Sequence, residues 1–279
     1  MKPRLSPEER RDRRQRAVRR GMFVLPSSIT MASIFCGFSS VVMSINAAGA
    51  RPEYYFLWAA GLLVLAGVFD GLDGRVARAT NTATEFGVQL DSLADVVSFG
   101  MAPAILAYRY GFFNLGIHDS HVRAAGWAAC FVFTACGALR LARFNVQVGS
   151  VDARFFVGLP IPAGAACVAS VIIWHPTPPP SASYAYAFAA ELFLVGLLMV
   201  STLRFPSFKK RTTTPRTAMV TSLSIVLFFA LMILLQQRFF IGFFTTYVIL
   251  ALAVNLAWKA GWRGIEPPHD AVEEPETVH

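Results

Sequence analysis

Apolar runs of membrane-spanning length follow one another along most of this sequence, and they constrain its fold more than any other feature. A helix needs about 20 predominantly apolar residues to cross a bilayer. About eight such runs are present, near residues 23–48, 54–72, 88–108, 124–140, 156–174, 184–203, 218–236 and 239–258. They are apolar on all sides, whereas helices of soluble domains pair an apolar stripe with a polar face. The sequence therefore predicts an all-α fold, a polytopic transmembrane helix bundle.

The composition agrees with this fold class. The chain is 55% hydrophobic and 15% charged, with a mean hydropathy of +0.50, whereas about a quarter of the residues in a soluble domain are charged. Its cysteines lie inside apolar runs without a CxxC pair. Buried free cysteines behave as small hydrophobes, so we expect neither a disulfide framework nor a zinc site.

Basic residues are concentrated ahead of the first apolar run. Residues 1–20 hold nine of them. A signal peptide could show this pattern, but the first run is longer than a usual signal core and further spans follow it. A nucleic-acid-binding arm is a second alternative on charge alone. We favour contact with anionic lipid headgroups and expect no nucleic acid partner.

The basic residues also predict the orientation of the chain, because short cytoplasmic loops carry an excess of Lys and Arg. With the N-terminus inside, the outer loops would hold only Arg51, Arg109, Arg123 and Arg238. Both termini are then cytoplasmic, in the inner membrane of the cell. We divide the chain into a basic segment (1–20), a core of six spans (21–210), an additional transmembrane hairpin (211–260) and a disordered acidic tail (261–279).

Four aspartates stand at the predicted cytoplasmic ends of the second and third spans, namely Asp70, Asp73, Asp91 and Asp95. A carboxylate facing hydrocarbon costs several kcal/mol, so such residues pair, bind a cation or line a polar cavity. Salt bridges to Arg75 and Arg78 are one alternative, but two arginines leave part of this charge uncompensated. Oxygen ligands without Cys or His favour hard divalent cations. The sequence therefore predicts a carboxylate-lined polar site near the cytoplasmic side that holds Mg²⁺ or Mn²⁺, with two ions expected.

A helical hairpin brings these carboxylates together. With its turn near residues 80–81, Asp70 and Asp91 lie at matching depth, Asp73 one turn nearer the cytoplasm, and Asp95 one turn deeper. Residues three or four apart share one face of a helix, so each helix presents a pair of carboxylates.

The residues around this hairpin suit a phosphoanhydride. Thr82 followed by Glu85 predicts a capping box at the start of the third span. Arg75 and Arg78 lie towards the cytoplasm, where they could bind phosphate oxygens. Three glycines leave space for close approach of a ligand, namely Gly71, Gly74 and Gly87.

The same stretch resembles the signature of the CDP-alcohol phosphatidyltransferases, D-x2-D-G-x2-A-R-x8-G-x3-D-x3-D. The matching positions are Asp70, Asp73, Gly74, Ala77, Arg78, Gly87, Asp91 and Asp95. The resemblance implies a membrane enzyme that moves a phosphatidyl group from a CDP-linked lipid to an alcohol and releases CMP. It also implies that Asp70, Asp73 and Asp91 bind metal, and that Asp95 binds a second metal and acts as the base. Asp91 is a further catalytic candidate, and Gly74 and Arg78 would contact CDP.

Further stretches resemble one branch of that family, the membrane-type phosphatidylserine synthases. They are SFGMAPA after Asp95, LRLARFNV at 139–146, FVGLPIPAGA at 156–165 and STLRFPSFK at 201–209. The branch implies CDP-diacylglycerol and L-serine as substrates and membrane lipids around the enzyme. Small helical bundles of this kind often pair, so we expect a homodimer. One departure is LPSSIT at 25–30, where relatives often carry Pro-Asn. This segment contains Thr30, which is a candidate nucleotide contact.

Residues 140–162 contribute a second group of candidates. Arg140, Arg143 and Arg154 are expected in one inner loop, with Asn145 beside them. They either set the topology or bind the lipid phosphate or the serine carboxylate, both of which arginine binds bidentately. Two prolines in GLPIPAG are expected to kink the fifth span.

Other functions remain open on the sequence alone. The aspartate signature does not separate serine from other acceptors, such as glycerol 3-phosphate, inositol phosphate or choline. A divalent-cation transporter could use the same carboxylates, and a non-catalytic lipid-binding scaffold would not need Asp95.

Overall fold

The structure is a computed structural model that describes residues 7–49, 51–79, 84–113, 120–146 and 155–206, together with Ile249 and Ala253. Side chains are described for 27–49, 51–76, 84–113, 120–146 and 158–203 and for the two isolated residues. The predicted last hairpin and the acidic tail lie outside these ranges, apart from those two residues.

The described chain is almost entirely helical. Its elements are α1 (Pro7–Asn46), α2 (Pro52–Ala79), α3 (Glu85–Asp95), η1 (Val96–Met101), α4 (Ala102–Tyr108), η2 (Arg109–Phe113), α5 (Ser120–Val146), β1 (Phe155–Val157), α6 (Ile161–Trp174), α7 (Ala182–Val200) and β2 (Arg204–Pro206). The all-α class is confirmed. The two strands are three residues each and pair antiparallel with each other.

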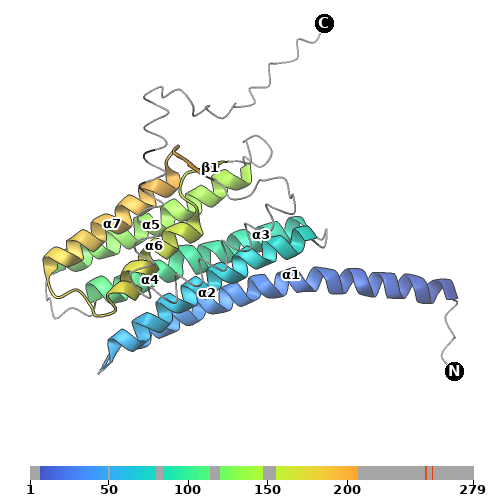
Figure 1. Ribbon diagram of the computed structural model, residues 1–279, viewed down its shortest axis with the longest axis horizontal. Coiled ribbons are helices and arrows are strands. Elements are labelled where there is room, and N and C mark those ends of the chain that lie inside the picture. The colour runs from blue at the N-terminus through green and yellow to red at the C-terminus, as the bar shows by residue number, and fades with distance from the viewer. Residues whose placement is uncertain are drawn as a thin grey trace, which may run out of the picture.

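Two helix pairs enclose the centre of the bundle (Figure 1). α1 packs along α2, and α5 packs along α7. The continuous helix from α3 to η2 lies between these pairs, and so does α6. α2 and α3 make little direct contact, whereas both pack against α1. α1 therefore acts as the common support of the two helices that carry the aspartates.

Five helices within the described ranges are long and apolar enough to cross a membrane. They are Ser27–Asn46, Pro52–Val76, Glu85–Phe113, Ser120–Val146 and Ala182–Val200, and Ile161–Trp174 is a shorter apolar helix. The chain is an integral membrane protein. These six helices overlap the first six predicted spans; the seventh and eighth predicted spans lie outside the fully described ranges. α1 begins at Pro7, so part of the predicted basic segment continues the first span as helix.

The fifth span differs from the prediction because its prolines start the helix and do not kink it. Pro160 occupies the N-cap of α6 and Pro162 lies in its first turn, where a missing N–H breaks no helical hydrogen bond. The residues before it form β1 and a turn at Gly158, which has φ +77°. A Cβ on Gly158 would lie 2.2 Å from the Met199 carbonyl oxygen, so only glycine fits there.

The third span is longer than predicted and contains two π-helical turns, η1 and η2. Its N-cap is also a correction, since the cap is Thr84 and not Thr82. The Thr84 hydroxyl accepts a hydrogen bond from the Gly87 N–H at 3.0 Å. Thr84 directly precedes the first helical residue, which is the position where a side-chain oxygen can reach the third N–H.

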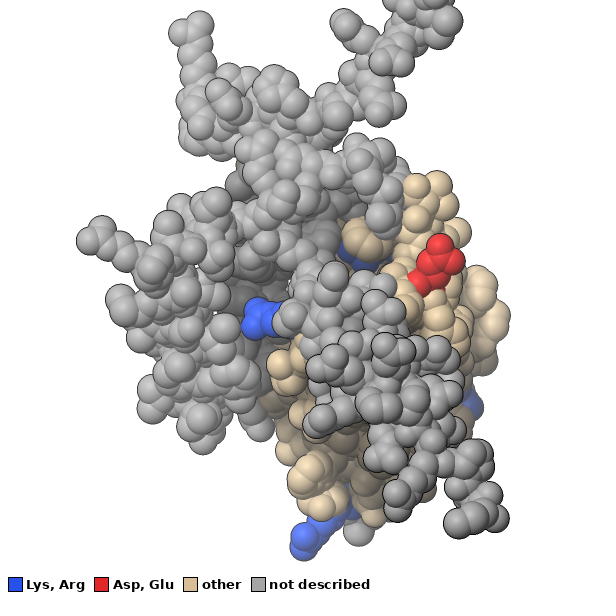
Figure 2. Space-filling model, turned by 90° about the vertical axis from the view of Figure 1, so that its right-hand side faces the viewer, with Lys and Arg blue, Asp and Glu red and all other residues tan. Residues whose placement is uncertain are grey.

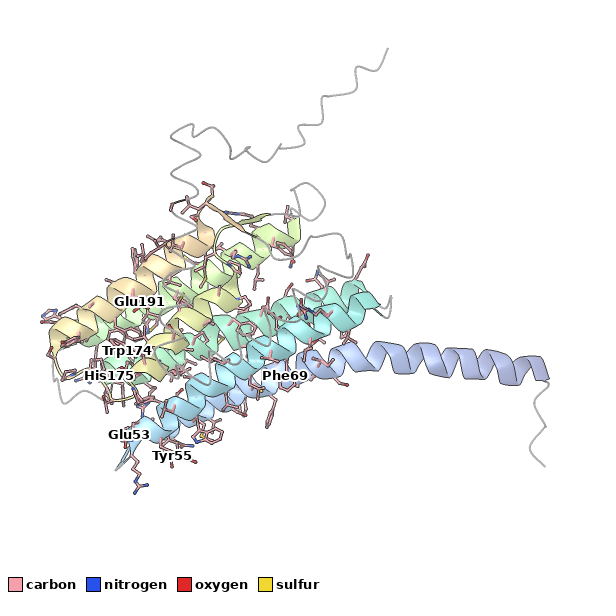
Figure 3. All side chains as sticks on the ribbon, viewed as in Figure 1. Glu53, Tyr55, Phe69, Trp174, His175 and Glu191 are labelled. Atoms are coloured by element: carbon pink, nitrogen blue, oxygen red, sulfur yellow. The ribbon has the colours of Figure 1, made fainter. Side chains whose placement is uncertain are left out.

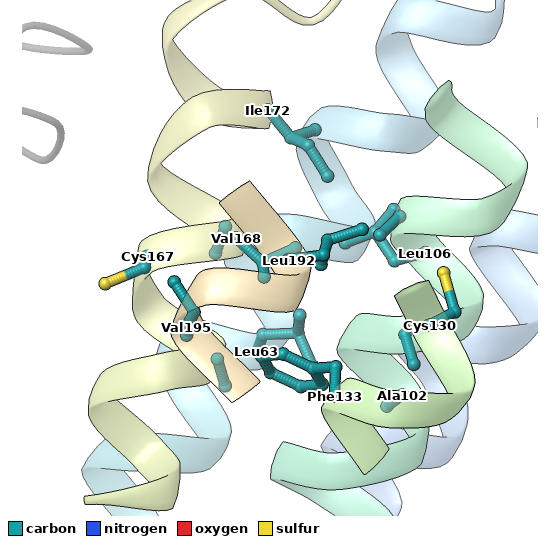
Figure 4. Packing of buried hydrophobic residues seen from close by; sticks show 14 of the residues in the cluster. Leu63, Ala102, Leu106, Cys130, Phe133, Cys167, Val168, Ile172, Leu192 and Val195 are labelled. Carbon is teal, nitrogen blue, oxygen red and sulfur yellow. The ribbon is translucent and has the colours of Figure 1, made fainter. Parts of the chain in front are cut away.

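Small apolar residues and a few large ones form the core. Leu63, Ala102, Phe133 and Val195 meet there from four different helices (Figure 4). Four free cysteines are all buried, at most 9% exposed, as the sequence indicates.

Aromatic rings fill the end of the bundle where α2 begins, which we call the aromatic end. The Tyr110 ring lies 5.4 Å from that of Phe56 and 5.6 Å from that of Phe188. The Tyr110 hydroxyl donates to the His175 carbonyl at 2.6 Å. Glu53, Tyr55, Trp174 and His175 all lie at this end (Figure 3).

Arg109 belongs to this end as well, and not to a loop as predicted. It lies in η2, and its guanidinium donates to the carbonyls of Ser44 and Ile45 at 3.2 and 3.0 Å. These are among the last carbonyls of α1, which have no partner within the helix. Arg109 therefore stabilises the C-terminus of α1.

Candidate metal centre

Three aspartates from two helices converge at the opposite end of the bundle, which we call the carboxylate end. One carboxylate oxygen from each of Asp70, Asp91 and Asp95 lies within 4.8 Å of the other two. Asp70 comes from α2, and the other two come from α3. Asp91 and Asp95 are four residues apart and share one face of α3. All three side chains are partly buried.

Asp73 is held separately from this group. It is 5% exposed and accepts a hydrogen bond from the Thr30 hydroxyl at 2.8 Å. Thr30 lies on α1 and is also buried. This contact fixes the side chain of Asp73 and links α1 to α2, so it gives Thr30 a role towards Asp73 that the sequence did not indicate.

The three converging carboxylates suit a hard divalent cation. Oxygen ligands lie about 2.0–2.6 Å from Mg²⁺ or Ca²⁺, so two ligands of one ion can stand about 4–5 Å apart. The observed limit of 4.8 Å falls in this range. The Asp95 Oδ1 atom is buried and accepts no hydrogen bond from the described residues. An unsatisfied buried carboxylate oxygen is costly unless a cation compensates it.

Arg140 brings a positive charge to the same site from a third helix. It lies in α5, is 7% exposed and acts electrostatically on Asp95. It therefore compensates part of the negative charge of the carboxylate end. The predicted inner loop is wrong for Arg140 and Arg143, since both lie inside α5.

Arg143 and Asn145 have partners within the fold. Arg143 donates to the Ser201 carbonyl, at 3.4 Å, just beyond the end of α7. Asn145 Nδ2 donates to the Ser92 hydroxyl at 3.0 Å, and Ser92 adjoins Asp91. Asn145 thus ties the end of α5 to the helix that carries two of the aspartates.

The remaining predicted site residues differ in their exposure and in their contacts. Arg75 is exposed. A Cβ on Gly71 would meet no atom within 4 Å, and Gly74 is partly buried. Gly87 donates the capping hydrogen bond to Thr84, which gives its backbone a structural role. The side chain of Arg78 and the whole of Arg154 lie outside the described parts of the chain.

Comparison with known proteins now decides the family. The sequence profile of CDP-alcohol phosphatidyltransferases matches residues 23–202. The chain belongs to the CDP-alcohol phosphatidyltransferase family. The match spans α1 from residue 23 through α7 and includes all the described candidate residues.

Several curated relatives in this family carry the name CDP-diacylglycerol–serine O-phosphatidyltransferase. The Helicobacter pylori protein (strain ATCC 700392 / 26695) is 38% identical over 193 residues, 68% of this chain and 74% of its own. The Methanocaldococcus jannaschii protein is 33% identical over 193 residues, 69% of this chain and 78% of its own. The Bacillus subtilis protein is 30% identical over 195 residues, 68% of this chain and 93% of its own.

Seen from the carboxylate end, the described surface of this CDP-alcohol phosphatidyltransferase carries both basic and acidic side chains among neutral ones (Figure 2).

Several polar residues near the site were missed by sequence reasoning. Ser33, Ser92, Ser98 and Thr134 all donate hydrogen bonds from inside apolar spans. Their signal is weak, because an isolated Ser or Thr in an apolar span is common and often bonds its own helix. Only Ser92 and Ser98, each three residues from Asp95, show a spacing that could have drawn attention to them.

Proposed function

We propose that this protein is a phosphatidylserine synthase, which transfers the phosphatidyl group of CDP-diacylglycerol to L-serine and releases CMP. The observation that supports this most is the convergence of Asp70, Asp91 and Asp95 within 4.8 Å at the positions of the family motif. The choice of serine draws on the names of the relatives, several of which are serine transferases.

In this proposal Asp95 is the general base. Serine's hydroxyl is a weak nucleophile at neutral pH, so a base must lie within hydrogen-bond reach of it. The Asp95 carboxylate has two oxygens, so one can bind an ion while the other takes the proton. The serine oxygen then bonds to the phosphorus that carries diacylglycerol, the phosphoanhydride bond to CMP breaks, and CMP leaves with the bonding electrons.

The aspartates would hold the divalent ions, Mg²⁺ or Mn²⁺, with two ions expected. Asp70, Asp91 and Asp95 offer the oxygen ligands that converge, and Asp73, fixed by Thr30, offers its carboxylate beside them. When bound, such an ion neutralises charge on the pyrophosphate and on the departing CMP. We further propose that Gly71, Gly74, Gly87, Arg75 and Arg78 lie along the CDP portion.

Arg140 is our candidate for the acceptor or lipid phosphate. Its side chain is buried beside the carboxylate end and acts electrostatically on Asp95, the proposed base. A planar guanidinium binds carboxylate and phosphate groups bidentately. Arg140 could therefore orient serine through its carboxylate while Asp95 receives the hydroxyl proton.

We also propose that the enzyme lies in the inner membrane with both termini and the carboxylate end in the cytoplasm, and that it forms a homodimer. The distribution of basic residues along the sequence supports the orientation. Native mass spectrometry in detergent would test the dimer by its mass.

The deciding experiment supplies purified full-length protein with CDP-diacylglycerol, Mn²⁺ and a panel of labelled alcohols. Asp95→Asn is measured beside it. The matched control is Glu53→Gln, which neutralises an acid at the aromatic end of α2. Lipid-bound label from serine alone, lost with EDTA and in Asp95→Asn but kept in Glu53→Gln, is the expected result.

Each other outcome points to a definite alternative. Label from another alcohol would keep the chemistry and replace serine as the acceptor. Release of CMP without transfer of label from any alcohol of the panel would contradict serine as the acceptor. No CMP release under any condition, together with cation flux in liposomes, would replace the enzyme with a transporter.

A further inference from the structure

The two helices that carry the carboxylates pack mainly against a third helix and not against each other. α2 and α3 make little direct contact, and each packs instead against α1. Yet Asp70 of α2 and Asp95 of α3 approach within 4.8 Å of each other. A side-chain hydrogen bond links Asp70 and Asp95, but it is lost when both carboxylates are charged, and like charges at this distance repel. Other contacts must therefore hold the two helices at this separation when both carboxylates bind an ion.

Two buried serines connect α1 to both helices at one level of the bundle. The Ser33 hydroxyl of α1 donates to the Ala66 carbonyl of α2 at 3.2 Å. The Ser98 hydroxyl of η1 donates to the Ser33 carbonyl at 3.1 Å. Both side chains are at most 2% exposed. We call these two hydrogen bonds the hydroxyl layer.

The hydroxyl layer lies about one helical turn from the carboxylates on each of the helices. Ala66 precedes Asp70 by four residues, and Ser98 follows Asp95 by three. Residues at these spacings lie on one face of a helix. The layer therefore fixes α2 and the third span on the same sides from which Asp70 and Asp95 project.

Close backbone packing reinforces the layer. A Cβ on Gly37 would lie 2.8 Å from Ser98 Cα, so α1 and η1 touch at this point. From the other side, the Thr134 hydroxyl of α5 lies 3.3 Å from the Gly100 carbonyl of η1, to which it donates. η1 is a π-helical turn that begins directly after Asp95, and such turns are rare and often lie at functional sites.

We propose that Ser33 and Ser98 are positioning residues that hold Asp70 and Asp95 at the separation at which they bind a divalent ion. This inference rests on the metal centre of the proposed function. Neither serine is expected to touch the ion. Their hydrogen bonds connect α2 to the third span through α1. They thereby set the distance between carboxylates on α2 and α3, which make little direct contact.

A purely structural role predicts a different result, and the chain offers a matched control. Ser40 of α1 donates to the Ala59 carbonyl of α2 at 2.8 Å and is 0% exposed. It joins the same two helices as Ser33, seven residues further from the site along α1. If such bonds only hold the bundle together, Ser40→Ala and Ser33→Ala should have the same effects.

The test measures Mn²⁺ binding by the full-length protein in detergent, from the electron paramagnetic resonance signal of free Mn²⁺. Ser33→Ala and Ser98→Ala are expected to weaken Mn²⁺ binding by about tenfold, the lower range for residues that orient metal ligands. Ser40→Ala should bind within about twofold of wild type, since distant sites act independently. Ser33→Thr keeps the hydroxyl and is expected to restore binding. The melting temperature measured without metal should fall by similar amounts in all three alanine variants.

The outcomes separate this inference from the function on which it rests. Wild-type binding in both Ser33→Ala and Ser98→Ala would overturn the positioning role and leave the metal centre intact. Equal weakening in Ser40→Ala would also overturn it, in favour of a general effect on the bundle. A wild-type protein that binds no Mn²⁺ would overturn the metal centre itself, and the positioning role with it. Because the two serines make separate bonds, either folded variant suffices for the test.

Discussion

At the aromatic end of the bundle, rings from Phe56, Tyr110 and Phe188 fill the space between the helices. At the carboxylate end, Asp70, Asp91 and Asp95 occupy the corresponding space. Aromatic pairs contribute about 0.5–1.5 kcal/mol each beyond the burial of their area. Neighbouring carboxylates repel one another instead. The comparison indicates that stability is concentrated at the end away from the chemistry, so that crowded charges can be tolerated at the other.

The largest expected effect is a loss of activity on substitution of aspartates at the carboxylate end. Asp70→Asn and Asp95→Asn should each lower transfer activity by about 100-fold or more, the usual contribution of a positioned acid or base. The double variant should lose little more, because residues acting as a unit are non-additive. Thermal stability should not fall, since each change removes a repelling charge. A clear drop in melting temperature for either single variant would contradict the comparison.

A substitution at the aromatic end should have the opposite pattern, with a loss of stability and little loss of activity. Phe112 is 1% exposed and stacks on Phe188. Phe112→Ala should lower the free energy of unfolding by about 3–5 kcal/mol, as for other large buried rings. Activity per folded molecule should remain near that of wild type. Denaturation in detergent gives the stability, and assays on the folded fraction give the activity; parallel loss of both would show that the two ends are coupled.

Arg140→Gln tests how the positive charge of Arg140 affects metal binding and turnover at the carboxylate end. Removing a positive charge beside Asp95 should strengthen Mn²⁺ binding several-fold, because a cation no longer repels the ion. Turnover should fall at the same time if Arg140 orients a substrate. Calorimetry for the metal and initial rates for serine measure the two effects. Weaker metal binding would instead assign Arg140 to support of the aspartates.

The smallest effect concerns one hydrogen bond at the aromatic end. Tyr110→Phe removes the donor to the His175 carbonyl and should cost about 1 kcal/mol of stability. Tyr108→Phe is the control, since its hydroxyl makes no hydrogen bond within the described chain. Equal melting temperatures for the two variants would mean that the Tyr110 bond adds nothing to the stability of this end.

Much of the architecture follows from the sequence because long apolar runs have few alternatives in a membrane. The six apolar helical spans of the described chain lie where apolar runs predict them. The meeting of Asp70, Asp91 and Asp95 agrees with the helical spacing of these residues, whereas Asp73, which the sequence groups with them, contacts Thr30. Both depend on periodicity, which a single sequence displays.

The structure differs from the sequence-based prediction where a short segment can adopt more than one local conformation. TATE offers two threonines as caps, and the structure uses Thr84. GLPIPAG can kink a helix or begin one, and only the preceding turn at Gly158 decides for the start at Ile161. The π-turn after Asp95 depends on packing against α1 and α5. Such tertiary contacts leave no periodic trace in the sequence.

The burial of the four native cysteines has a practical consequence for mapping the protein in its membrane. Cys36, Cys130, Cys136 and Cys167 are each at most 9% exposed, and maleimides react with accessible thiolates. A cysteine introduced at an exposed position such as Arg75 or Arg51 should therefore be labelled above a low background in the otherwise native chain. Membrane-impermeant reagents added to intact cells would then report directly which end of the bundle faces the cytoplasm.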